Sequence, residues 1–129
     1  EAFADYELIN VNKAAQMYSE KLKDSELVLP FVPDGYVSSW AQYTVQLGDN
    51  VDRDKLVAHL KENSIPSMVY YARPMHKQGA FVGTRSENAD CAVTEKLCKT
   101  VLSLPMHPYL ETEDIDKVCK CILEYLANE

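Results

Sequence analysis

One loop of this sequence gathers residue types that can bind a polar ligand. His76 follows the pair Tyr70 and Tyr71 and the cation Arg73, and Gln78 comes two residues later. Aromatic, cationic, imidazole and amide groups on one loop are suited to holding a ligand with phosphate or hydroxyl groups. The loop therefore predicts ligand contact, although aromatic residues at the start of a loop are also often the rim of a core.

The other two histidines have simpler interpretations. His107 lies between Pro105 and Pro108, and two prolines fix a rigid turn, so a packed imidazole in a structural turn is favoured. His59 lies on a predicted helix and is expected to be solvated. Neither residue is assigned a chemical role.

Nucleophilic and metal sites are not indicated. Ser38 and Ser39 lack the glycine-flanked elbow of a nucleophilic serine. The cysteines are Cys91, Cys98, Cys119 and Cys121. They form no CxxC pair, and the Cys119-x-Cys121 spacing without a nearby histidine is poor for zinc, so buried reduced thiols and no metal are predicted. The residues alone predict no complete active site.

Composition limits the classes of protein further. The 129 residues fit one domain, and 47% hydrophobic with 26% charged residues is typical of a soluble globule. A net charge of −7 argues against binding nucleic acid through its phosphates. The four isolated glycines form no phosphate-binding loop. Because no signal peptide or apolar run of membrane-spanning length occurs, a cytoplasmic protein without a membrane partner is expected.

The elements that must position the loop can be predicted from periodicity. Apolar residues spaced by three and four predict a helix over residues 2–23. Asp52 and Thr112 are predicted to cap two further helices, and a short helix is expected over 91–100. The last helix has the most regular apolar face.

Three strands are predicted between these helices. Alternation of apolar and polar residues marks 41–47, and short apolar runs mark 68–71 and 101–104. The connection 72–89 is longer than most loops of a compact domain, and such loops are often functional or mobile. The expected class is therefore α/β or α+β, with a small three-stranded sheet covered by helices.

Three segments carry a family resemblance. They read SWAQYTV at 39–45, YY at 70–71 followed by PxHxQ at 74–78, and VLSLPMHPYL at 101–110. With their order and spacing, they resemble the C-terminal part of the pyridoxal-phosphate-dependent nucleotide-sugar aminotransferases of the DegT/DnrJ/EryC1/StrS family. The resemblance implies the small domain of a fold-type I aminotransferase over residues 25–129, with residues 1–24 as the end of the long helix from the large domain.

The resemblance also implies a function for the parent protein. Family members move an amino group from an amino-acid donor, usually glutamate, to a keto group on a nucleotide-linked sugar, and the closest branch makes bacterial surface polysaccharides. Pyridoxal 5'-phosphate acts as the electron sink on a lysine of the protein. No lysine here lies in the family's Schiff-base motif, so the catalytic residues would belong to an upstream domain and this fragment alone would be inactive.

The candidate loop acquires a specific role by resemblance. In the family it borders the sugar-nucleotide pocket, often that of the neighbouring subunit of a homodimer. Tyr71 and His76 are thus implied substrate contacts, with Tyr70 and Gln78 as further candidates. Tyr70 stands where relatives often have histidine or arginine, so the sugar is left open.

Two alternatives remain. Some proteins of this fold are regulators or dehydratases, and their difference resides largely in the other domain. A free-standing, non-catalytic α+β module for ligand binding or interaction would explain the missing lysine without a second domain.

Overall fold

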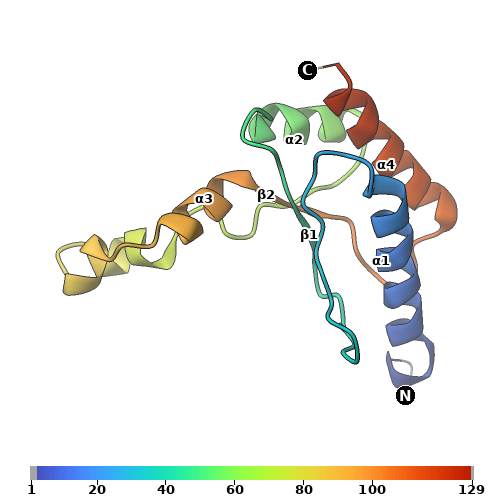
Figure 1. Cartoon of the computed structure of the whole chain (residues 1–129), viewed down its shortest axis with the longest axis horizontal. Helices are drawn as coiled ribbons and strands as arrows, with labels where there is room; N and C mark the ends of the chain where they lie inside the picture. The colour runs from blue at the N-terminus through green and yellow to red at the C-terminus, as the bar shows by residue number, and fades with distance from the viewer. Residues whose placement is uncertain (1–2, 129) are drawn as a thin grey trace.

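The computed structural model describes residues 3–128 and divides them between a helix-packed body and a projecting arm (Figure 1). The body contains α1 (Leu8–Leu22), β1 (Tyr43–Gln46), α2 (Arg53–Glu62), β2 (Val101–Leu104) and α4 (Thr112–Leu126). The arm contains the turns η2 (Met75–Lys77), η3 (Gly79–Phe81) and η4 (Arg85–Asn88) and the helix α3 (Ala92–Thr100). This mixture of helices with a small sheet confirms the predicted class.

Over the described residues the helix at the N-terminal end forms as predicted; residue 2 of the predicted range lies outside them. A short π-helix, η1 (Phe3–Glu7), runs directly into α1. The buried residues of α1 are Val11, Ala14, Ala15, Tyr18 and Leu22. They recur at the spacing of one helical face, and α1 packs beside α4 (Figure 1). The helix ends near the predicted domain boundary at residue 24, but the division into two parts stays a prediction.

The sheet has two strands rather than the predicted three. β1 and β2 pair antiparallel, with Tyr43 opposite Leu104. In the predicted strand 68–71, only Met68 pairs, through two backbone hydrogen bonds of 3.0 and 2.9 Å with Ser103. Tyr70 and Tyr71 form a turn by which the chain leaves the sheet for the arm, so the pairing cannot continue. The strand prediction over 68–71 is therefore wrong beyond one bridge.

One face of this sheet is covered by helices and the other is more open. Tyr43 and Val45 are buried, whereas Thr44 and Gln46, on the opposite face, are half-buried. The buried side chains share one core with α1, α2 and α4. Alternation along a strand places successive side chains on opposite faces, so the sequence pattern predicted the buried face correctly.

Buried tyrosines connect α1 to this sheet. The rings of Tyr18 and Tyr43 are 5.0 Å apart, and both side chains are fully buried. The Tyr18 hydroxyl donates to the Pro105 carbonyl at 2.9 Å, and the Tyr43 hydroxyl lies 2.8 Å from the Ser19 hydroxyl. Each buried hydroxyl therefore has a partner. Burial raises the pKa of both phenols above its usual value.

Side chains cap α2 and α4. The Asp52 carboxylate accepts hydrogen bonds from the backbone of Asp54 and Lys55, both at 3.1 Å, which confirms the predicted cap of α2. The predicted cap of α4 is wrong by one residue. Glu111, in an extended conformation, forms a capping box with Asp114, and Thr112 is already helical. An acidic side chain before the first turn also complements the helix dipole.

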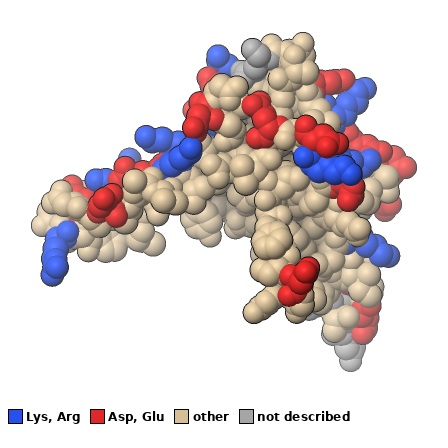
Figure 2. Space-filling model, in the orientation of Figure 1, with Lys and Arg blue, Asp and Glu red and all other residues tan. Residues whose placement is uncertain are grey.

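The arm contains little buried surface. Instead of an irregular loop over 72–89, the chain forms three successive 3-10 turns before α3. Within residues 70–100, His76 and Cys98 are the buried residues. Acidic and basic side chains are mixed over arm and body alike (Figure 2). The arm is therefore held by few apolar contacts.

The four cysteines are free; three of them are buried as predicted, whereas Cys91 is half-buried. Burial raises the pKa of the Cys119 thiol to about 11, which keeps it protonated and unreactive at neutral pH. Among residues 3–128, no group of three or more histidine, cysteine, aspartate and glutamate side chains is arranged to hold a metal ion. None of the helices described has the length and apolarity to cross a membrane.

Candidate functional site

Two of the four predicted substrate contacts present their side chains to solvent. Tyr70 and Tyr71 form the turn between the sheet and the arm, and their side chains are 55% and 66% exposed. Their ring centroids are 6.5 Å apart. Two accessible aromatic faces beside phenolic hydroxyls can bind both the apolar and the hydroxyl surfaces of a sugar-like ligand.

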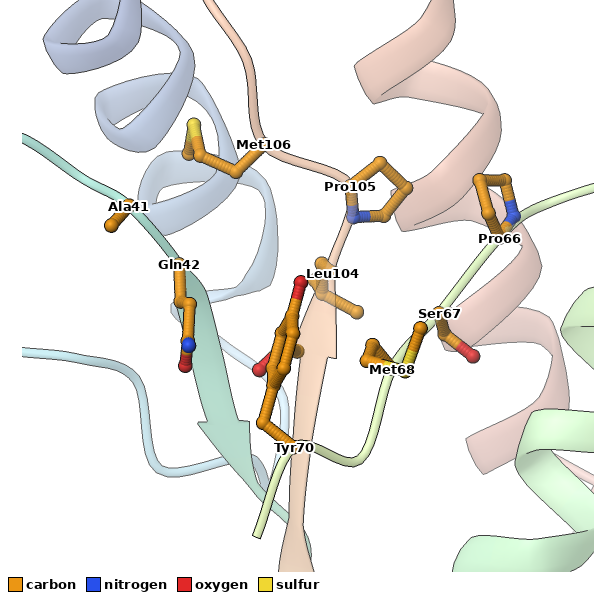
Figure 3. Close-up of a pocket in the computed structure, with 10 residues that line it drawn as sticks. Ala41, Gln42, Pro66, Ser67, Met68, Tyr70, Leu104, Pro105 and Met106 are labelled. Atoms are coloured by element: carbon orange, nitrogen blue, oxygen red, sulfur yellow. The ribbon is translucent and has the colours of Figure 1, made fainter.

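Tyr70 also lines a cavity of about 170 Å³. The lining also includes Gln42, just before β1, and the apolar side chains of Met68, Pro105 and Met106. Figure 3 shows the Tyr70 ring between Gln42 and Met68, with its hydroxyl toward Leu104 and Pro105. The cavity therefore forms where three segments far apart in the sequence meet at the more open side of the sheet.

His76 has a different environment. Its side chain is buried, and Nε2 lies 3.0 Å from Oε1 of Glu95 on α3. This hydrogen bond is the main cause that lowers the pKa of the Glu95 carboxyl, and Lys77 and Lys99 act in the same direction. The pair links the turn η2 to α3 inside the arm. Substrate contact by His76 stays a prediction.

Gln78 is also engaged within the arm. Its Nε2 donates to the Arg73 carbonyl at 3.0 Å, which closes the turn around η2. Lys77 adds a second link, from Nζ to the Glu87 carbonyl at 3.1 Å. In this conformation His76 and Gln78 hold the arm together, while Tyr70 and Tyr71 are the accessible members of the predicted set. The contact role of Gln78 stays a prediction.

The other two histidines differ in part from expectation. The predicted turn at His107 is present, and Nδ1 accepts from the Tyr109 backbone at 3.2 Å, but the imidazole is exposed rather than packed. His59 is half-buried rather than solvated, because its ring lies 5.3 Å from that of Tyr125. Helix–helix packing between α2 and α4 makes this contact, and a single-helix pattern does not report it.

Sequence reasoning overlooked Glu95 and Gln42. Glu95 lies 19 residues after its partner His76, so no local spacing connects the two. Gln42 belongs to the alternating pattern before β1, which indicated only that it lies on the polar face. Both residues are identified only by the groups that lie near them in the folded chain: His76 for Glu95, and Tyr70 for Gln42.

The described residues do not fit pyridoxal phosphate. The cofactor needs a lysine whose amine is deprotonated, normally by burial or a nearby cation. Every lysine here is exposed, and a hydrogen bond to Asp116 raises the pKa of Lys21, which favours its charged form. Within residues 3–128, the cavity beside Tyr70 has no lysine in its lining. The described part of the chain therefore does not supply the lysine that this cofactor needs.

Comparisons with known proteins relate the chain to curated enzymes. The UDP-2-acetamido-2-deoxy-3-oxo-D-glucuronate aminotransferase of Pseudomonas aeruginosa is 38% identical, over 85% of this chain and 29% of its own length. The UDP-N-acetyl-3-dehydro-alpha-D-glucosamine 3-aminotransferase of Acidithiobacillus ferrooxidans is 37% identical, over 85% and 28% respectively. This chain thus spans less than a third of the length of these relatives.

A solved structure agrees with the sequence relatives. A DegT DnrJ EryC1 StrS aminotransferase from Brucella abortus matches with a TM-score of 0.82 and 37% identity, covering 93% of this chain and 31% of that one. The family model of the DegT/DnrJ/EryC1/StrS aminotransferases matches residues 6–123, which include the arm, the cavity and all of the body except the end of α4. The chain therefore belongs to the DegT/DnrJ/EryC1/StrS aminotransferase family.

Proposed function

We propose that this chain is the small domain of a longer aminotransferase that moves an amino group to a keto nucleotide sugar in amino-sugar or surface-polysaccharide biosynthesis. The observation that carries the proposal is the family match over residues 6–123. The names of two relatives, both aminotransferases of UDP-linked sugars, support the substrate class. The amino donor is an amino acid, in our proposal glutamate, and the enzyme works in the cytoplasm.

The chemistry of amino transfer would depend on residues outside this chain. Pyridoxal phosphate, when bound, supplies an electron sink for the exchange, and we propose that the rest of the longer protein holds it. On this proposal the 129-residue chain is inactive by itself. It also predicts that the isolated chain mixed with pyridoxal phosphate develops no lysine-linked absorbance that is lost on reduction.

The contribution of this chain is to bind and orient the sugar. Tyr71 and Tyr70 are accessible and are proposed to contact it, with His76 and Gln78 as the remaining candidates from the same segment. The projection of the arm from the body (Figure 1) supports a role at the neighbouring subunit of a homodimer. Proper orientation lowers the barrier because reacting groups are held in place before the chemical step.

An activity assay tests this proposal. The protein made from the complete coding sequence around this chain is incubated with glutamate and keto forms of UDP- and dTDP-linked sugars, and 2-oxoglutarate is measured. Tyr71→Phe should weaken use of the sugar, through KM or kcat, while cofactor retention stays unchanged. A solvent-exposed phenol elsewhere, Tyr36, provides the matched control Tyr36→Phe.

Two results would contradict the proposal. If none of the sugars gives 2-oxoglutarate, the protein is not an aminotransferase of these substrates. The remaining interpretations are then a regulator, a dehydratase or a non-catalytic module. Equal kinetics of Tyr71→Phe and the parent enzyme would remove the Tyr71 hydroxyl from the sugar site.

A further inference from the structure

The cavity beside Tyr70 is lined by uncharged side chains only, among the residues that the structure describes. This contrasts with a chain in which 26% of the residues are charged. Phosphate and carboxylate groups are recognised by cationic side chains or by charge-assisted hydrogen bonds. The lining therefore suits an uncharged group rather than the diphosphate of a nucleotide sugar.

Neutral polar groups at this cavity retain hydrogen-bonding capacity. The Ser103 hydroxyl is already engaged, 2.7 Å from the Thr44 hydroxyl. For the side chains of Gln42, Ser67 and Tyr70, by contrast, residues 3–128 provide no hydrogen-bond partner. The carboxamide of Gln42 can both donate and accept, as can the two hydroxyls. A ligand with one donor and one acceptor can therefore pair with the Gln42 carboxamide.

The rest of the wall is apolar. Pro66, Met68, Pro105 and Met106 surround the polar groups, and Figure 3 shows the two methionines on different sides of the Tyr70 ring. Methionine side chains adapt to small apolar groups because they are unbranched and polarizable. The cavity thus combines an amide partner with a surface for a methyl group.

The size of the cavity limits what it can contain. Pockets that hold a complete small-molecule ligand usually measure roughly 300–1,000 Å³. At about 170 Å³, this cavity is suited to one substituent of a larger ligand whose remainder lies outside it.

We infer that this cavity binds the acetamido substituent of a nucleotide-linked sugar. The amide of the substituent pairs with the Gln42 carboxamide, and its methyl group packs against Met106 and the Tyr70 ring, which line the same side of the cavity as Gln42. Gln42 is then a specificity-determining residue. The identity of the ligand as a sugar rests on the proposed function, and the names of two relatives that act on acetamido or N-acetyl sugars support the choice of substituent.

A binding comparison with the 129-residue chain tests the inference. UDP-N-acetylglucosamine and UDP-glucose differ only in the acetamido or hydroxyl group at one carbon, and each is titrated while amide and methionine methyl signals are followed by NMR. We expect affinity about tenfold higher for the acetamido probe, which one net hydrogen bond and a buried methyl group can supply. Shifts should be largest at the Gln42 side-chain amide and the methyl group of Met106, and smaller at the methyl group of Met68 across the Tyr70 ring.

Matched variants assign the preference to the cavity. Gln42→Leu should reduce the affinity ratio of the two probes to about one. Gln46→Leu is the control, since Gln46 lies on the same face of β1 but outside the cavity lining. Thermal unfolding of both variants verifies that the fold is intact. Equal binding of the two probes by the parent chain, an unchanged ratio in Gln42→Leu, or an equal loss in both variants would overturn the inference.

This experiment and the activity assay can fail separately. Binding to the chain requires no turnover, so a full-length protein without transaminase activity would refute the proposed function and leave the acetamido preference measurable. Conversely, the full-length protein could be an active transaminase while Gln42→Leu leaves the preference for the acetamido probe unchanged. That result would refute only this inference.

Discussion

The body and the arm are stabilised by different kinds of interaction. In the body, apolar and aromatic side chains such as Tyr18, Leu60 and Ile122 have no solvent exposure. In the arm, short helical turns are joined by polar contacts, among them the half-buried pair His76–Glu95 and the exposed bond from Lys77 to the Glu87 carbonyl. Apolar burial is the largest favourable contribution to folding, whereas exposed polar contacts each contribute little. We therefore expect the body to determine global stability and the arm to open locally.

Truncation of the core should give the largest difference between the two regions. Ile122→Ala leaves a cavity in the core beside α4 and should lower the free energy of unfolding by about 2–5 kcal/mol. Val82→Ala, at a 66% exposed position of the arm, should change it by less than about 0.5 kcal/mol. Urea unfolding monitored by circular dichroism measures both. Similar losses in the two variants would show that the arm folds as part of the same core.

The loss of one hydroxyl should affect stability differently at a buried tyrosine of the body and at an exposed tyrosine beside the arm. Tyr18→Phe leaves the Pro105 carbonyl without its 2.9 Å donor and should cost about 1–3 kcal/mol of unfolding free energy. Tyr71→Phe removes an exposed hydroxyl and should leave stability unchanged. Thermal unfolding of the two variants side by side provides the measurement. A stable Tyr18→Phe protein would mean that water replaces the lost donor.

Helix capping contributes to the stability of the body. Asp52 accepts two backbone hydrogen bonds at the start of α2, so Asp52→Ala should lower the stability of the protein measurably in thermal unfolding, because two helix N–H groups lose their partner. These bonds lower the pKa of the Asp52 carboxyl, so its contribution is present above its unfolded pKa and is lost as the pH falls through the folded value. Asp54→Ala, which removes an adjacent exposed carboxylate, is the control. If the parent chain and Asp52→Ala lose stability equally in acid, the cap makes no pH-dependent contribution.

The smallest expected effect lies within the arm. Glu95→Gln removes the carboxylate that pairs with His76 and should make hydrogen exchange of η2 and α3 amides a few-fold faster, while α1 and α4 are unchanged. Because the folded-state pKa of Glu95 is lowered, the pair stabilises the arm above the unfolded pKa of Glu95. Protection should decrease as the pH falls through its folded pKa.

Asp90→Asn, at an exposed position of the arm, is the control for Glu95→Gln. Uniformly faster exchange through arm and body in Glu95→Gln would contradict the separation of the two regions.

Local patterns determined much of the fold. The three-and-four spacing in α1 and α4 and the alternation in β1 predicted most of the residues that face the core, because side-chain periodicity follows directly from helix and strand geometry. Leu123 and Ala41, which fit the patterns, are exposed. The motifs at 39–45, 74–78 and 101–110 correctly predicted the family. The segment that contains Tyr70 and Tyr71 also predicted a ligand contact at the base of the arm, where both tyrosines are accessible.

Only the tertiary structure decided which distant groups meet. The predicted strand at 68–71 is reduced to a single bridge at Met68, because the chain turns away from the sheet at Tyr70 and Tyr71. The tertiary structure joined His76 to Glu95 within the arm, and it brought Gln42 to the cavity beside Tyr70. Periodicity indicates that a face is buried but not what covers it, since partners far apart in sequence are selected by the path of the whole chain.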